Sequence, residues 1–347
     1  MLVDEKYMRR ALQLARQGAG HTSPNPMVGA VIVGPDGIII GEGWHRQCGE
    51  GHAEVNAVAS VKDPNLLRDS TIYVTLEPCS HYGKTPPCAK LIIERGIPRV
   101  VVGALDPFVK VSGRGVAMLR EAGVEVTVGV LENECRALNC RFMTAHTTGR
   151  PWVQLKWAQT ADGFIALPPE AGENPLRMST PVTMKLMHRQ RALCDAIVVG
   201  AATARIDDPS LTTRYWPGKS PLRVVLSRQL SIPDNLKLLN DGLPTIVYNS
   251  VKSEKQGAVE YVKMDTADPV AWLADLYRRG VTSVMIEGGA DVLQQMIGAG
   301  VWDETRIEVS PRRVGQGTTD PAIEGRVREQ YLIDGNQITY LAPSPQH

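Results

Sequence analysis

Four residues in the first third of the chain have the types and spacing of a hydrolytic metal centre. They are His52 and Glu54, two positions apart, and Cys79 and Cys88, each of which follows a proline. One imidazole and two thiolates can fill three positions of a zinc ion and leave the fourth open for water. Zinc lowers the pKa of such a water to about 7. Because Glu54 is too close to His52 for both to be ordinary ligands, we expect Glu54 to transfer protons between water and substrate.

The wider pattern is typical of enzymes that remove an amino group from a base. His-x-Glu followed by Pro-Cys and a second cysteine is found in zinc-dependent base deaminases, where two residues separate the cysteines. Here the loop Ser80 to Pro87 separates Cys79 from Cys88, and we expect this loop to line the pocket. Two alternatives are a structural zinc site with Cys48 or His81 as fourth ligand and a chance succession of buried residues.

Alternating helices and strands are predicted to position these residues. Met8, Leu12 and Ala15 recur at helical spacing, and Gly18 ends that first helix. Two strands, 30–33 and 38–40, follow and are joined by a hairpin turn at 34–37. The other elements expected in this half are a helix from about residue 53, strands at 72–76, 100–103 and 124–128, and helices at 89–95 and 116–122. This alternation predicts a three-layer α/β/α domain, in which His52 and Cys88 each directly precede a helix.

A break in regular structure at Thr147 to Pro151 predicts a boundary between domains 1–148 and 149–347. A chain of 347 residues is long enough for two cores. The second half again alternates, with strands expected at 152–157, 196–199, 223–226, 245–248 and 283–286 and helices around 182–192 and 271–279. No Gly-x-Gly-x-x-Gly follows a strand, so a Rossmann site is not indicated. Gly288-Gly289, ahead of a helix, either presents backbone N–H groups to a phosphate or forms an ordinary turn.

The composition limits the class of partner. The 38 basic and 37 acidic side chains give a net charge of +1, which argues against a nucleic-acid binder and so against a nucleic-acid-editing deaminase. No apolar run is long enough to span a membrane, and the start of the chain lacks the layout of a signal peptide. We therefore expect a cytoplasmic enzyme with a small-molecule substrate that forms a homo-oligomer, either a dimer or a tetramer. Cys135, Cys140 and Cys194 are expected to be buried hydrophobic residues.

Longer strings make the resemblance specific. In order along the chain they are Ser23-Pro24-Asn25-Pro26-Met27-Val28-Gly29, Gly41-Glu42-Gly43-Trp44-His45, His52-Ala53-Glu54, Thr75-Leu76-Glu77-Pro78-Cys79-Ser80-His81 and Gly83-Lys84-Thr85-Pro86-Pro87-Cys88. Together they resemble the family of bifunctional riboflavin-biosynthesis deaminase/reductases, over nearly the whole chain. The resemblance implies a cytidine-deaminase-like domain, followed by a dihydrofolate-reductase-like α/β domain.

The resemblance also implies what the first domain does. In the family it deaminates 2,5-diamino-6-ribosylamino-4(3H)-pyrimidinone 5′-phosphate. His52, Cys79 and Cys88 would then hold one Zn²⁺, and Glu54 would be the catalytic proton shuttle. The residues that would line the pyrimidine pocket are Asn25, His45, His81 and Lys84. A carboxamide such as that of Asn25 suits a base edge because it can both donate and accept hydrogen bonds, but an asparagine between two prolines can equally cap a turn.

The second domain of the family reduces the ribosyl group to ribityl with NADPH. The matching strings are Lys156-Trp157-Ala158-Gln159-Thr160-Ala161-Asp162-Gly163, the run from Ala202 to Arg214, and Ile286-Glu287-Gly288-Gly289-Ala290. By position, the residues that would contact NADPH are Ala158, Thr203, Asp207, Gly289, Ala290 and Asp291, within a stretch that continues to Gln295. Those that would contact substrate are Arg191, Leu211, Arg214 and Glu287, and the arginines suit its phosphate.

Three strings depart from the family pattern. The family's Ser-x-Trp-Ile-Thr is replaced by Gly172 to Ser179, its Val-Leu-Asp-Ser by Val225 to Arg228, and its Asp-Pro-Asn-Pro by Asp106 to Val109. Arg228 is either a partner for the 2′-phosphate of NADPH or a solvated surface arginine. The departures leave two alternatives open: a relative recruited to another pyrimidine-derived pathway, and a deaminase with a non-catalytic second domain.

Overall fold

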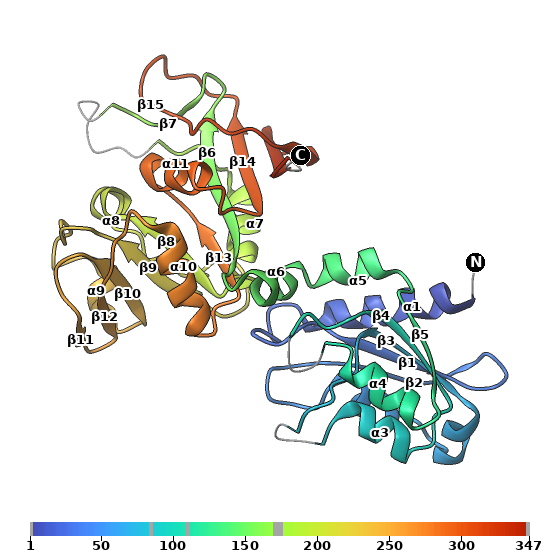
Figure 1. Ribbon diagram of the computed structural model, residues 1–347. Coiled ribbons are helices and arrows are strands. Elements are labelled where there is room, and N and C mark those ends of the chain that lie inside the picture. The colour runs from blue at the N-terminus through green and yellow to red at the C-terminus, as the bar shows by residue number, and fades with distance from the viewer. Residues whose placement is uncertain (1–2, 83–85, 109–111, 169–175, 345–347) are drawn as a thin grey trace. The chain divides into compact units, whose positions relative to one another are not determined.

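The computed structural model describes residues 3–82, 86–108, 112–168 and 176–344 (Figure 1). The chain forms two compact units, Met1–Gly149 and Arg150–His347. In the described part of the chain no helix is long and apolar enough to cross a membrane.

The first unit is built on a five-stranded sheet with the order β2-β1-β3-β4-β5. Strands β1 and β2 form the predicted hairpin, because Gly34 N–H donates to the Ile38 carbonyl and Gly37 takes a φ of 77°. Strand β1 also pairs antiparallel with β3, whereas β3, β4 and β5 are parallel. The strands are β1 (Gly29–Val33), β2 (Ile39–Trp44), β3 (Thr71–Leu76), β4 (Arg99–Ala104) and β5 (Glu125–Val128).

Helices cover both faces of this sheet. Because successive strand residues point to opposite faces, Ile32 and Ile72 pack with one helix layer while Val31 and Tyr73 pack with the other. The first layer is α2 (Ala53–Ala59), α3 (Cys88–Glu94) and α4 (Arg114–Glu121). The second is α1 (Val3–Ala15), α5 (Glu132–Leu138) and α6 (Cys140–Thr148). The three-layer α/β/α prediction is confirmed, although the sequence analysis expected no helices at 132–148. Cys88 begins α3 rather than preceding it, which corrects the prediction.

The second unit contains a ten-stranded sheet with the order β11-β12-β10-β9-β8-β13-β6-β14-β17-β16. Its centre is parallel, and β11, β16 and β17 pair antiparallel. The five predicted strands are β6 (Trp152–Thr160), β8 (Ala196–Gly200), β9 (Leu222–Leu226), β10 (Thr245–Asn249) and β13 (Ser283–Ile286). The strands of this sheet that were not predicted are β11 (Glu254–Gln256), β12 (Val259–Lys263), β14 (Glu304–Ser310), β16 (Arg326–Ile333) and β17 (Asn336–Ala342). Two further strands that were not predicted, β7 (Phe164–Ala166) and β15 (Thr318–Thr319), pair with each other in a separate two-stranded sheet.

Two apolar clusters hold helices against this sheet. Trp272 and Leu293 pack with Val198 in one cluster, and Ala204 and Leu238 pack with the opposite side of the same strands in the other. The helices are α7 (Pro181–Ala192), α8 (Ala201–Asp207), α9 (Lys237–Asn240), α10 (Pro269–Arg278) and α11 (Ala290–Gly298). Each unit therefore has a core of its own.

Candidate active sites

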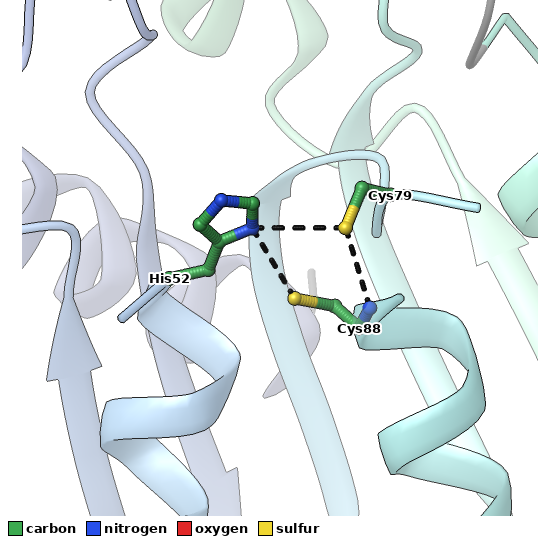
Figure 2. Close-up of side chains that lie close together, drawn as sticks. All are labelled: His52, Cys79 and Cys88. Carbon is green, nitrogen blue, oxygen red and sulfur yellow. Dashed lines mark hydrogen bonds between the residues drawn. The ribbon is translucent and has the colours of Figure 1, made fainter. Parts of the chain in front are cut away.

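Three candidate metal ligands of the first unit meet beyond the carboxyl end of β3, the middle strand of its sheet (Figure 2). His52 is the N-cap of α2, Cys88 is the first residue of α3, and Cys79 lies three residues beyond β3. The Nδ1 atom of His52 lies 3.6 Å from the Cys79 Sγ and 3.4 Å from the Cys88 Sγ. All three potential ligand atoms lie within 4.8 Å of one another.

This geometry fits zinc. With metal–ligand distances of about 2.0–2.3 Å, a tetrahedral arrangement separates neighbouring ligand atoms by about 3.5 Å. The Cys88 and His52 side chains hold the pKa of the Cys79 thiol well below its usual range, which favours a thiolate. Neither Cys48 nor His81 joins the cluster of potential ligands found among the described residues. The site thus keeps an open position, unlike a structural zinc site.

Glu54 lies in the first turn of α2 and lines the same cavity as His52 and Cys79. Its side chain is 3% exposed, and burial raises its pKa to about 7. It does not belong to the cluster of potential ligands found in the described part of the chain. A carboxyl group with a pKa near neutrality can both accept and return a proton, which suits a general acid–base group.

The cavity at these residues has a volume of about 350 Å³. Asn25, His45 and His81 line it, and Lys84 lies outside the described residues. The His45 Nδ1 donates to the Gly51 carbonyl at 3.2 Å, so its Nε2 can accept from the Asn25 amide at 3.4 Å. Burial lowers the pKa of His45, which favours this neutral form.

An aromatic wall that the sequence analysis missed also lines this cavity. Its rings are Phe108, Phe142 and His146, and the His146 ring lies 5.1 Å from Phe108 and 4.4 Å from Phe142. Phe142 and His146 belong to α6, a helix that the sequence analysis did not predict. Phe108 stands where the family pattern has asparagine, and that departure was the one signal available.

Glu77 holds the turn that carries Cys79. Its buried carboxylate accepts backbone N–H bonds from Asp106, Gly113, Gly115 and Val116, at 2.9 to 3.3 Å. Three of these donors lie at the start of α4, where a negative charge is favourable. A side chain at Gly115 would come within 1.9 Å of the Pro78 carbonyl oxygen, so α4 lies in direct backbone contact with the turn.

The second unit contains a cleft of about 710 Å³. Six of the residues expected to contact NADPH line it, as do two of the four expected to contact substrate: these are Ala158, Thr203, Asp207, Gly289, Ala290, Asp291, Arg214 and Glu287. They come from β6, from α8 after β8, from the segment between α8 and β9 that carries Arg214, and from the end of β13 and the start of α11. Of the expected stretch from Gly289 to Gln295, Val292, Gln294 and Gln295 do not line the cleft. Gly289 is the N-cap of α11 with a φ of 81°, so its conformation is one that favours glycine.

The other two expected substrate residues lie behind the wall of this cleft. Arg191 forms a bidentate ion pair with Glu287 at 2.7 and 2.6 Å, and both side chains are largely buried. Leu211 is 2% exposed and has a φ of 52°. Their contact with the cleft is therefore through its lining residues.

Lys156 and Tyr215 line the cleft but were missed as site residues. Burial lowers the pKa of Lys156, although Glu287 nearby opposes this shift. A lysine in the middle of a strand carries no sequence pattern that marks it. Arg228 is exposed and is not one of the described lining residues, which favours a solvated surface arginine over a partner for the 2′-phosphate of NADPH. Residues 172–175 of one departing string lie outside the described residues, and Leu176 to Ser179 line the cleft.

The two sites define a class: a zinc-binding, cytidine-deaminase-type domain followed by a reductase domain that uses NADPH. Family models agree, since residues 1–104 match the cytidine and deoxycytidylate deaminase zinc-binding region and residues 151–334 match the RibD C-terminal domain. The chain belongs to the riboflavin biosynthesis protein RibD family, whose members are bifunctional deaminase/reductases.

Relatives match along most of the chain. The riboflavin biosynthesis protein RibD of Aquifex aeolicus is 39% identical over 91% of this chain and 89% of its own length. That of Escherichia coli is 34% identical over 90% of this chain and 89% of its own. A Thermotoga maritima diaminohydroxyphosphoribosylaminopyrimidine deaminase/5-amino-6-(5-phosphoribosylamino)uracil reductase aligns with a TM-score of 0.88 at 36% identity, covering 99% of both chains. Acinetobacter baumannii RibD aligns with a TM-score of 0.89 at 30% identity, also covering 99% of both chains. Recruitment to another pathway is not favoured by these matches.

Proposed function

We propose that the first unit deaminates 2,5-diamino-6-ribosylamino-4(3H)-pyrimidinone 5′-phosphate and that the second unit reduces the ribosyl group of the product to ribityl with NADPH. The observation that carries this proposal is the cavity that unites His52, Cys79 and Cys88 with a separate, buried carboxyl group at Glu54. The lining of the second cleft by Ala158, Thr203, Asp207 and the start of α11 supports the second step.

In the deaminase step His52, Cys79 and Cys88 would hold zinc, which supplies a Lewis acid that activates water. Glu54 takes a proton from the attacking water and passes it to the amino group, which leaves as ammonia. Asn25 and His45 form a polar pair that can donate to and accept from the base edge. His81 and Lys84 complete the substrate-binding group.

In the reductase step the N-terminus of α11, at Gly289, Ala290 and Asp291, receives a phosphate of NADPH on its backbone N–H groups. Ala158, Thr203 and Asp207 form the rest of the cofactor site. Arg214 binds the substrate phosphate, and the remaining substrate residues, Arg191, Leu211 and Glu287, shape the cleft around it.

We also propose that the protein is a cytoplasmic homo-oligomer, either a dimer or a tetramer. Strand β16 lies at the edge of its sheet and exposes Val327, Tyr331 and Leu332, which supports an association surface. All six cysteines lie in the described part of the chain and none is joined in a disulfide, which fits a reducing compartment.

Mass spectrometry of products tests the two reactions. The protein is incubated with the diaminopyrimidinone phosphate, first without and then with NADPH. We expect exchange of one amino group for oxygen in the first reaction and the further gain of two hydrogens in the second. An unchanged substrate would contradict the deaminase proposal, and a deaminated product that NADPH does not alter would contradict the reductase proposal.

A matched pair of variants tests the metal. Elemental analysis of the wild type should give about one zinc per chain. Cys79→Ser should lose zinc and deamination together, because the serine hydroxyl is a poor ligand. Cys48→Ser is the control, since Cys48 is exposed and lies outside the cluster. Loss of zinc in Cys48→Ser would reinstate the four-ligand structural site.

A further inference from the structure

Two side chains of α7 hold the chain segment that carries Arg214. The His188 Nδ1 accepts a hydrogen bond from the backbone N–H of Arg214 at 2.9 Å, and the Arg191 Nη1 donates to the carbonyl of Thr212 at 3.1 Å. His188 and Arg191 are three residues apart, so they lie on the same face of the helix. The segment 212–214 is thus fastened to α7 at two backbone atoms.

His188 is suited to this contact by its surroundings. It is 1% exposed, and its ring packs edge to face against the Tyr215 ring, with the two ring centroids 4.8 Å apart. Burial, together with the positive charges of Arg191 and Arg214, lowers the pKa of His188 to about 4. The imidazole is therefore neutral at physiological pH and keeps the lone pair that accepts from Arg214.

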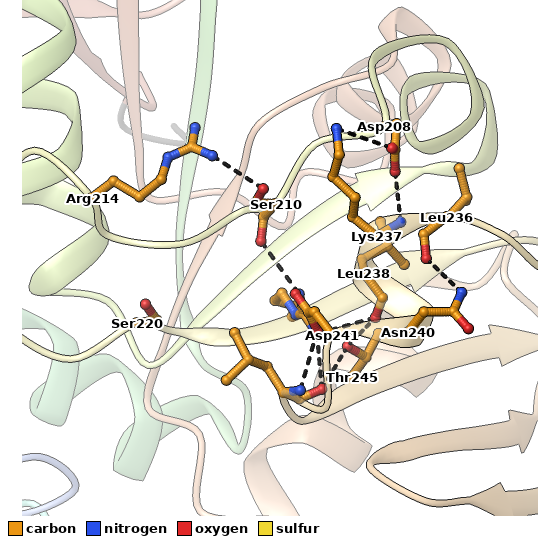
Figure 3. A network of polar contacts seen from close by, with 12 residues as sticks. Asp208, Ser210, Arg214, Ser220, Leu236, Lys237, Leu238, Asn240, Asp241 and Thr245 are labelled. Atoms are coloured by element: carbon orange, nitrogen blue, oxygen red, sulfur yellow. Dashed lines mark hydrogen bonds and ion pairs between the residues drawn. The ribbon is translucent and has the colours of Figure 1, made fainter.

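The Arg214 side chain is held in turn by Ser210, which is itself bonded to Arg223 of β9. The Arg214 Nη1 donates to the Ser210 Oγ at 3.1 Å (Figure 3), and the Ser210 carbonyl accepts from Arg223 at 3.4 Å. Arg223 is itself buried and paired with Asp241 at 2.6 and 2.7 Å. Thr213 is also held, since its N–H donates to the Ser220 Oγ at 3.1 Å and its Oγ1 donates to the Lys219 carbonyl at 3.2 Å. The bond at His188 is the one made by the Arg214 backbone itself, so it acts directly on where the Arg214 side chain begins.

We propose that His188 is a positioning residue of the reductase cleft: through the Arg214 backbone N–H it aims the Arg214 guanidinium at the substrate phosphate. The inference rests on the proposed function, in which Arg214 binds that phosphate. His188 is one of the fully enclosed residues behind the cleft and does not line it. Its effect on the reaction therefore passes through Arg214, because removal of the acceptor takes away the part-buried bond to the Arg214 N–H.

Two variants separate the hydrogen bond from the packing of the ring. His188→Phe keeps the ring against Tyr215 and removes the acceptor, whereas His188→Asn loses the ring and places an amide oxygen close to the position of Nδ1. We expect His188→Phe to raise the KM for 5-amino-6-(5-phosphoribosylamino)uracil about three- to tenfold, with kcat and the KM for NADPH within about twofold of the wild type. His188→Asn should retain a KM within about twofold of the wild type.

The full-length protein provides the folding control, because deamination and the thermal midpoint can be measured on each preparation. If the phenyl ring is not accommodated, His188→Ala supplies the variant without an acceptor. A wild-type KM in the acceptor-free variant overturns the inference. An equal rise of KM in His188→Asn and His188→Phe also overturns it, because the effect would then come from packing.

A double-variant cycle distinguishes this inference from the proposed function. Combined with Arg214→Ala, His188→Phe should add little to the KM, since both changes remove the same interaction. Arg205→Ala is the matched control, because Arg205 is an exposed arginine of α8 that does not line the cleft. If Arg214→Ala raises the KM but the effects of the two changes are additive, the role of His188 is overturned while the phosphate site at Arg214 stands. An unaffected Arg214→Ala would overturn the phosphate site and the His188 inference together.

Discussion

His52 and Glu54 lie two residues apart at the start of α2, and we propose different chemical roles for them. His52 is the N-cap of the helix and faces Cys79 and Cys88, whereas Glu54 is enclosed in the first turn. The spacing lets one short helix present a metal ligand and a proton carrier to the same cavity. Sequence reasoning reached this assignment because ligand chemistry restricts the residue types so strongly.

Glu54→Gln separates the two roles. The amide keeps the shape of the carboxyl group but cannot carry a proton, so we expect deamination to fall by about 10²–10⁴-fold. Zinc content should remain that of the wild type. Elemental analysis and the rate of ammonia release, measured on one preparation, check both statements. Glu50→Gln is the control, because Glu50 is exposed and does not line the cavity. If Glu54→Gln lost zinc, Glu54 would have to be a ligand.

Arg214→Ala tests the phosphate site in the second unit. Loss of a charge-assisted contact is expected to raise the reductase KM by the equivalent of about 2–3 kcal/mol. Deamination in the first unit should be unchanged, since Arg214 lies in the cleft of the second. Steady-state kinetics with the deaminated substrate gives the reductase KM, and ammonia release from the diaminopyrimidinone phosphate gives the rate of deamination. A KM equal to that of the wild type would move the phosphate site to another cation.

At the scale of elements, strands that form unbroken apolar runs were predictable, whereas β14, which is largely buried but contains charged residues, and exposed elements were not. Strands such as β1 and β8 are buried along their whole length and appear as unbroken apolar runs. Strand β16 lies at the sheet edge with almost every residue exposed, so its sequence contains charges and no alternation. Helices α5 and α6 are separated by a single residue, Asn139, and their short apolar faces gave no clear period. Phe142 and His146 of the aromatic wall were missed because they lie on α6.

The contact between α4 and the turn at Pro78 predicts the effect of Gly115→Ala. The added methyl group would collide with the Pro78 carbonyl, so the turn that carries Cys79 must shift. We expect the free energy of unfolding to fall by about 1–3 kcal/mol and the affinity for zinc to weaken. Gly298→Ala in α11 is the control, because nothing lies within 4 Å of its added methyl group. Denaturant unfolding measures the free energy of unfolding, and competition with a chelator measures the affinity for zinc. If both values for Gly115→Ala equal those of the wild type, the turn is not constrained by α4.

At the scale of the whole molecule, each unit has its own sheet and its own apolar clusters. The break predicted at 147–151 contains the division between the units at Gly149 and Arg150, although regular structure continues to Thr148 because α6 extends to that residue. What the sequence could not provide was the extent of the second sheet, since pairing between distant strands such as β6 and β14 leaves no local pattern.

A fragment from Arg150 to His347 should therefore fold by itself. We expect it to be soluble, to show a cooperative thermal transition, and to reduce 5-amino-6-(5-phosphoribosylamino)uracil with NADPH. Circular dichroism and an absorbance assay for NADPH oxidation measure these properties, with the full chain as control. A fragment that stays insoluble under all refolding conditions would indicate that the two units depend on each other for stability.

The three proposed zinc ligands come from positions 52, 79 and 88, which join one strand end to two helix starts. A metal held at these positions acts as a reversible cross-link that closes loops of the unfolded chain. Because the ligand geometry exists only once these segments have met, the free energy of zinc binding becomes part of the folding free energy of the first unit. The ion that would activate water would thus also cross-link one strand end and two helix starts, and removal of zinc is expected to lower the free energy of unfolding of the first unit.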